Sequence, residues 1–68
     1  MSISFILYVT GGDSMFGDVI KRLRTSYNFS QVRLAEELNV SKQTVSNWEN
    51  NNILPSIEML IKIAQFFL

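Results

Sequence analysis

Apolar residues recur along the chain in two different patterns, separated by a pair of glycines. From Ile3 to Val9 they form a nearly continuous run rich in β-branched and aromatic side chains, which is typical of a β-strand. After Gly11-Gly12 the spacing changes to three and four residues, which is typical of amphipathic helices. The pattern therefore predicts one strand over residues 3–10 and helices over most of the remaining chain.

Residues 1–14 have two interpretations. A lone strand needs hydrogen-bonding partners, so this segment either pairs with a copy of itself across a dimer or is a dispensable extension before Met15, which resembles a natural start. We favour the extension, because nothing else in the chain predicts a strand. The apolar run is far shorter than the roughly 20 residues that cross a bilayer, and it lacks the basic region and cleavage site of a signal peptide.

Four helices follow, each marked by a serine suited to cap its first turn. Ser14 precedes a helix whose apolar stripe contains Phe16, Val19, Ile20, Leu23 and Tyr27. Ser30, Ser41 and Ser56 precede helices over 31–38, over 42–50 and from 57 onward. In the helix over 31–38 the apolar positions are Val32, Leu34, Ala35 and Leu38. The expected core contains Phe16, Leu23, Leu34, Leu38, Val45, Trp48, Leu60 and Ile63.

The two middle helices are joined by a very short connection. Only Asn39, Val40 and Ser41 separate them, which is room for nothing but a tight turn. Ala35 lies where the second helix must cross the first, and Val40 provides an apolar plug for the turn. These features are typical of a helix-turn-helix.

The helix over 42–50 is polar on one side and apolar on the other. At about 100° per residue, Lys42, Ser46, Gln43 and Asn47 fall within an arc of roughly 140°, and Val45 and Trp48 fall opposite. Amide, hydroxyl and ammonium groups are those that contact base edges in the DNA major groove. A solvated helix face would show the same pattern, but the neighbouring turn favours a DNA-contacting helix.

From about Phe16 to Phe67 the sequence resembles the phage-repressor (Cro and lambda-repressor-like) helix-turn-helix family of bacterial transcriptional regulators. The matching segments are Leu23-Arg24, SQVRLAEELNVSKQTVSNWEN from Ser30 to Asn50, and PSIEMLIKIA from Pro55 to Ala64. The resemblance implies an all-α fold of four to five short helices, in a DNA-binding domain over residues 15–68. Four helices fit before Leu68, where the chain ends inside an apolar stretch, so we expect the natural chain to continue.

The resemblance also implies roles for individual residues. Base contacts are implied for Lys42, Gln43 and Asn47, and base or phosphate contacts in some members for Thr44 and Ser46. Phosphate contacts are implied for Gln31 and Asn50, and Arg33 adds local positive charge for the same purpose.

An acid on the DNA-contacting helix requires neutralisation, and the family pairs the residue matching Glu49 with the one matching Arg24. We expect this to be a structural pair. If it is only partly buried, it contributes about 1 kcal/mol or less to stability. Removing Arg24 is expected to cost more in DNA binding than in folding, because an uncompensated Glu49 would then face the DNA.

Three asparagines stand where family members often have glycine. Asparagine is the next best residue for a left-handed turn. We therefore predict a positive φ for at least two of Asn28, Asn39 and Asn51.

Composition limits how such a domain works. Six Lys and Arg balance six Asp and Glu, so bulk charge does not indicate a nucleic-acid partner, and one copy would make few phosphate contacts. The chain has no His and no Cys, which excludes the usual zinc sites, imidazole bases and thiol nucleophiles. We expect no enzyme activity, metal, cofactor, membrane partner or small-molecule substrate.

Together these features predict a cytoplasmic regulator, a repressor, that binds double-stranded DNA as a homodimer. The DNA-contacting helix over 42–50 would occupy the major groove. The alternative is a protein-interaction or antitoxin-like module with the same fold. The neutral charge and the apolar N-terminus support that alternative.

Overall fold

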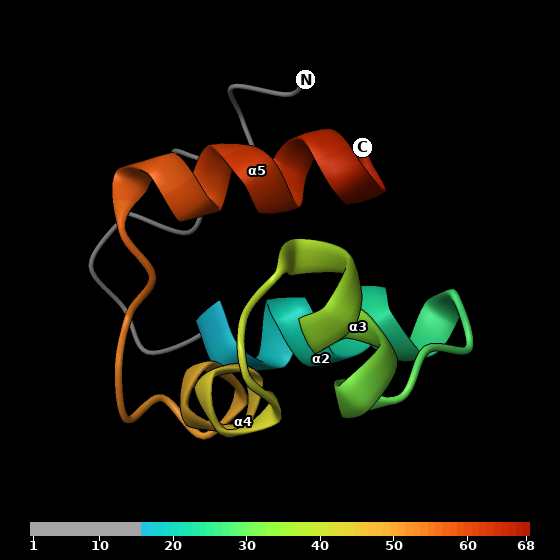
Figure 1. Cartoon of the computed structure of the whole chain (residues 1–68), viewed down its shortest axis with the longest axis horizontal. Coiled ribbons are helices and arrows are strands. Elements are labelled where there is room, and N and C mark those ends of the chain that lie inside the picture. Colours follow the sequence, from blue (N-terminus) through green and yellow to red (C-terminus); the bar gives the residue numbers. More distant parts are fainter. Residues whose placement is uncertain (1–15) are drawn as a thin grey trace.

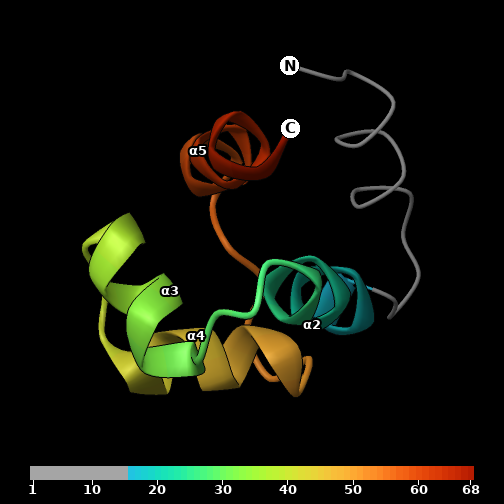
Figure 2. The same cartoon turned by 90° about the vertical axis from the view of Figure 1, so that its right-hand side faces the viewer.

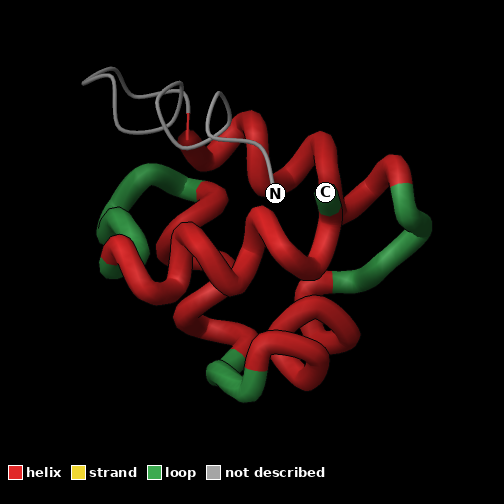
Figure 3. Tube along the Cα trace, turned by 90° about the horizontal axis from the view of Figure 1, so that it is seen from above, coloured by secondary structure: helices red, strands yellow, loops and turns green. Residues whose placement is uncertain are grey.

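The computed structural model describes residues 16–68, which form four helices (Figure 1). These are α2 (Phe16–Ser26), α3 (Gln31–Leu38), α4 (Lys42–Glu49) and α5 (Ile57–Phe67). The all-helical expectation is confirmed for this part of the chain, where Figure 3 shows helices joined by short loops and no strand. The predicted strand over 3–10 and the predicted cap at Ser14 lie outside the described residues.

The helices are arranged with α4 and α5 on opposite sides of the molecule. Figures 1 and 2 show α5 along the top and α4 along the bottom; α3 lies in front of α2 in Figure 1 and to the left of it in Figure 2. The loop over 50–56 connects the two sides. One face of α4 is thereby left uncovered by the other helices.

Three serines begin helices as the sequence predicts. The Ser30 hydroxyl accepts the backbone N–H of Arg33 at 3.0 Å, and Ser41 accepts that of Thr44 at 3.0 Å. Ser56 does the same for Met59 at 3.1 Å. Each hydroxyl satisfies a backbone donor that has no partner within its helix, which fixes where α3, α4 and α5 start.

Three asparagines adopt the left-handed conformation, which confirms the prediction for all of them. Their φ angles are 61° at Asn28, 60° at Asn39 and 61° at Asn51. At the end of α3 the backbone N–H of Asn39 reaches the Glu36 carbonyl, and that of Val40 reaches the Ala35 carbonyl at 2.9 Å. These bonds satisfy helix-end carbonyls while the chain reverses into α4.

Asn39→Val is expected to lower the free energy of unfolding by about 1–2 kcal/mol, because a β-branched residue fits the left-handed region poorly. Asn39→Gly should leave stability unchanged or slightly raised. Urea unfolding followed by circular dichroism measures both. Asn52→Val, an exposed site without a positive φ, is the matched control. Equal midpoints for Asn39→Val and Asn52→Val would contradict the argument.

A single apolar core joins the four helices. Its buried side chains are Phe16, Ile20, Leu34, Ala35, Leu38, Val45, Trp48, Leu60, Ile63 and Phe67. Seven of the eight predicted core residues are among them, and the eighth, Leu23, is partly buried and packs against the cluster. Burial of this apolar surface supplies most of the stability of a domain without disulfides.

Three apolar positions are less buried than their spacing indicates. Val19 is half-buried, Tyr27 is 50% exposed and Val32 is 49% exposed. Val32 lies roughly 110° around α3 from the centre of the arc formed by its three buried residues, so it projects outward. Tyr27 packs edge-on against Phe67 and donates its hydroxyl to the Phe67 carbonyl at 2.8 Å, so it joins the end of α2 to the end of α5 although half of its surface is exposed.

Candidate nucleic-acid interface

The turn between α3 and α4 sets the geometry of the candidate site. Ala35 is 3% exposed, and Val40 packs from the turn against the core, as the sequence predicts. The small Ala35 side chain lets α4 cross close to α3. The two helices therefore form one rigid unit whose outer surface includes α4.

The exposed side of α4 carries four of the five predicted base-contacting residues. Lys42 and Gln43 are exposed, and Ser46 and Asn47 are half-buried. On the opposite side Val45 and Trp48 are 0% and 3% exposed, so Trp48 is a core residue. The helix is anchored by its apolar side and presents hydrogen-bonding groups on the other.

Thr44 lies beyond the edge of this polar arc. It is half-buried, and its hydroxyl lies 2.8 Å from the Ser41 hydroxyl at the start of the helix. In this structure Thr44 therefore supports the capped first turn of α4.

Two side-chain hydrogen bonds run along the polar side of α4. Gln43 Nε2 donates to Asn47 Oδ1 at 3.1 Å. Asn50 Nδ2 lies 3.4 Å from Ser46 Oγ, at the long end of the hydrogen-bond range. Asn50 is the C-cap residue with φ −92°, so α4 ends one residue earlier than predicted.

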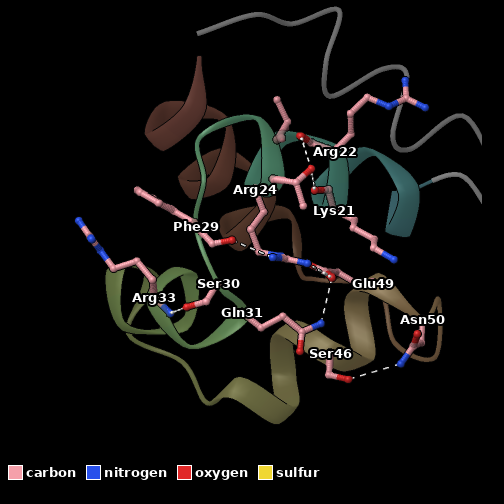
Figure 4. A network of polar contacts seen from close by, with 12 residues as sticks. Lys21, Arg22, Arg24, Phe29, Ser30, Gln31, Arg33, Ser46, Glu49 and Asn50 are labelled. Atoms are coloured by element: carbon pink, nitrogen blue, oxygen red, sulfur yellow. Dashed lines mark hydrogen bonds and ion pairs between the residues drawn. The ribbon is translucent and has the colours of Figure 1, made fainter.

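Glu49 joins three helices through its carboxylate. Arg24 Nε donates to Oε2 at 2.6 Å, and Arg24 Nη2 donates to Oε1 at 3.1 Å. Gln31 Nε2 donates to the same Oε1 at 3.0 Å. Figure 4 shows the guanidinium lying between Glu49 and the Phe29 carbonyl, which accepts from Arg24 Nη1 at 2.8 Å. One acid thus ties α2 and α3 to the end of α4.

The Arg24–Glu49 ion pair is more deeply buried than the sequence argument assumed. The side chains of Arg24 and Glu49 are 11% and 3% exposed. The small contribution expected for a partly buried pair therefore does not apply. A charge buried to this extent is costly once its partner is removed.

The predicted phosphate-contacting residues differ in their surroundings. Gln31 is half-buried and directs its amide N–H toward Glu49, into the protein. Arg33 remains 54% exposed, pairs with Glu37 at 2.9 Å and stacks 4.7 Å from the centre of the Phe29 ring. Of the three, Arg33 is the one with a charged group available to solvent.

Two supporting residues were missed by the sequence argument. Gly17 is buried in α2, where a Cβ would lie 2.8 Å from Asn51 Oδ1 and collide with the Glu49 carbonyl. Its N–H donates to Asn51 Oδ1 at 2.9 Å. On α5, Lys62 Nζ donates to the Leu38 carbonyl at 2.8 Å and so caps the end of α3. These contacts join segments distant in sequence, so local spacing gives no signal for them.

Other kinds of site find no support in residues 16–68. This part of the chain contains no detected pocket and no group of three potential metal ligands. None of its helices has the length and apolar character needed to span a membrane.

Comparison with known proteins assigns the family. The helix-turn-helix family profile matches residues 20–67, so the chain belongs to this family, of the Cro/C1 type. The four described helices fit its lambda-repressor-like fold.

Several named relatives share this segment. The chain is 40% identical over 52 residues to the HTH-type transcriptional activator BcrR of Enterococcus faecalis, matching 76% of this chain but 26% of that protein. It is 35% identical over 48 residues to the HTH-type transcriptional regulator YgzD of Bacillus subtilis. It is 40% identical over 48 residues to the HTH-type transcriptional regulator MJ0272 of Methanocaldococcus jannaschii. Both matches cover 71% of this chain and 73% of the relative.

The chain thus spans about a quarter of the length of BcrR and about three quarters of YgzD and MJ0272. No solved structure matches it significantly.

Proposed function

We propose that this chain binds double-stranded DNA sequence-specifically, with α4 in the major groove, and acts as a transcriptional regulator. The observation that carries the proposal is the polar side of α4, held outward by the buried Val45 and Trp48. A helix of this size fits the major groove, and its side chains match the hydrogen-bonding groups of base edges. The regulators named among its relatives support the same function.

Individual roles follow from position and exposure. Lys42, Gln43, Ser46 and Asn47 would contact bases, with Thr44 at the edge of that surface. Phosphate contacts are assigned to Gln31, Arg33 and Asn50. The Arg24–Glu49 pair would orient α4 and neutralise the acid nearest the DNA. No catalytic step is assigned to any residue.

We further propose that the protein acts as a homodimer. A chain of zero net charge makes few phosphate contacts, and a second copy on an adjacent half-site doubles them. Exposed apolar side chains in the loop before α5 and at the first residue of α5 support a contact between copies: Ile53, Leu54 and Ile57 are 56%, 66% and 59% exposed. The proposed regulator is cytoplasmic. It would act as a repressor, because the dimer covers the DNA that it occupies.

The proposal is tested by fluorescence anisotropy with a random-sequence duplex at about 50 to 200 mM salt. On a random sequence Lys42 has no specific base to contact, so Lys42 and Arg33 would each neutralise a phosphate. Log K should then fall with log salt concentration with a slope near −2 or steeper. Absence of binding at about 50 mM salt would contradict DNA binding and favour the protein-interaction alternative.

A further inference from the structure

The hydrogen bond between Gln43 and Asn47 restricts what Gln43 can offer to a base. A glutamine amide has two N–H donors and one carbonyl acceptor. Gln43 gives one N–H to Asn47 Oδ1 at 3.1 Å, which leaves one N–H and the carbonyl Oε1. Both residues lie on the exposed arc of α4, one turn apart, so the remaining groups face away from the core.

One donor beside one acceptor is the complement of adenine in the major groove. Adenine presents the N7 acceptor and the N6 amino donor, whereas guanine presents two acceptors, N7 and O6. A bidentate contact with guanine would require both N–H groups of Gln43, which is possible only if the bond to Asn47 breaks. The bond therefore favours adenine over guanine at the position that Gln43 faces.

Asn47 is the residue available to hold Gln43. Gln31 lies at the start of the neighbouring helix, but its amide nitrogen donates to Glu49 at 3.0 Å and therefore points into the protein. Asn47 is itself fixed, because its backbone carbonyl accepts the N–H of Asn52 at 2.9 Å and its side chain is half-buried. The Gln43 amide is thus oriented from within α4.

We infer that Asn47 orients the amide of Gln43 so that this side chain recognises an adenine and rejects a guanine. Asn47 acts here as a positioning and specificity-determining residue, and its own amide N–H groups remain free. The inference rests on the proposed DNA binding and adds the identity of one base.

The test is selection of bound duplexes from a random pool by the wild type and by three variants. The wild type should enrich a site in which one position prefers adenine to guanine by about tenfold or more. Asn47→Ala should reduce that preference several-fold and should also remove the preference at the base that Asn47 itself contacts, while preferences at the remaining positions persist. Asn47→Asp should keep the adenine preference, because its carboxylate still accepts from Gln43, while binding all sequences more weakly through phosphate repulsion. Gln65→Ala, an exposed amide on α5, is the matched control.

A base analogue tests the contact between the Gln43 amide and N7 of the adenine directly. Replacing the selected adenine by 7-deazaadenine removes the N7 acceptor but keeps the N6 amino group, so the wild type should lose part of the affinity that Gln43→Ala loses. Gln43→Ala should itself be insensitive to the analogue.

The outcomes separate this inference from the proposed function. Absence of enrichment by any variant would contradict sequence-specific binding itself. Enrichment without an adenine position, an unchanged preference in Asn47→Ala, or a change confined to a neighbouring position would overturn the role assigned to Asn47 while leaving DNA binding intact.

Discussion

Arg24→Ala is expected to lower the free energy of unfolding by roughly 3–5 kcal/mol, the usual cost of leaving a buried charge without its partner. The Glu49 side chain is 3% exposed and would retain only the N–H of Gln31. A domain of this length has a total stability of roughly 3–10 kcal/mol, so the loss removes between about a third and all of it and should lower the unfolding temperature strongly. Thermal unfolding followed by circular dichroism measures the loss.

Two variants separate the buried charge from other effects. Arg24→Met combined with Glu49→Gln removes both charges and should recover much of the stability lost in Arg24→Ala. Arg33→Met breaks the exposed pair with Glu37, whose side chains are 54% and 36% exposed, and should cost less than about 1 kcal/mol. Equal losses in Arg24→Ala and Arg33→Met would contradict the argument.

The burial of the Arg24–Glu49 pair revises the sequence-based expectation about Arg24. From the sequence, the loss of Arg24 is expected to harm DNA binding more than folding, because an unpaired Glu49 would face the DNA. The observed burial reverses that order, because the fold itself depends on the neutralised carboxylate. A folded Arg24→Ala variant with unchanged affinity for DNA would contradict both the sequence-based expectation and the one based on the observed burial.

Gly17→Ala is expected to lower the free energy of unfolding by about 2–3 kcal/mol, although alanine is the better helix former. The added methyl group would meet the backbone carbonyl of Glu49 and lie 2.8 Å from Asn51 Oδ1. Because the nearest atom is the backbone carbonyl oxygen of Glu49, which cannot rotate away as a side chain can, α2 must move away from the end of α4. Urea unfolding of the variant measures the cost.

Asp18→Ala is the matched control, since Asp18 is exposed in the same turn of α2. It should change stability by less than about 0.5 kcal/mol. If the close approach at Gly17 were absent, Gly17→Ala would instead stabilise the domain by up to about 1 kcal/mol. A gain of that size would overturn the packing described here.

Local features of the fold could be predicted because each depends on a few neighbouring residues. Ser30, Ser41 and Ser56 cap their helices through bonds that span three residues, and Asn39 is selected for its own backbone conformation. The buried side of α4 follows from its helical spacing alone. These signals also produce the correct order and bounds of the helices to within a residue or two.

Features that join distant segments could not be predicted in the same way. The contact of Lys62 with the Leu38 carbonyl and the role of Gly17 depend on how helices cross. The pairing of Arg24 with Glu49 was suggested by family resemblance, whereas its burial and the third bond from Gln31 required the structure. The phosphate contacts involve DNA and remain proposals.

The central claim, that the exposed side of α4 contacts DNA, is tested most directly by NMR titration of the ¹⁵N-labelled protein with a short duplex at low salt. We predict that the largest amide shifts fall on residues 42–47 and at the start of α3, with Glu58 and Gln65 on α5 nearly unmoved. Shifts confined to α5 and the loop over 50–56, or none along α4, would contradict the claim.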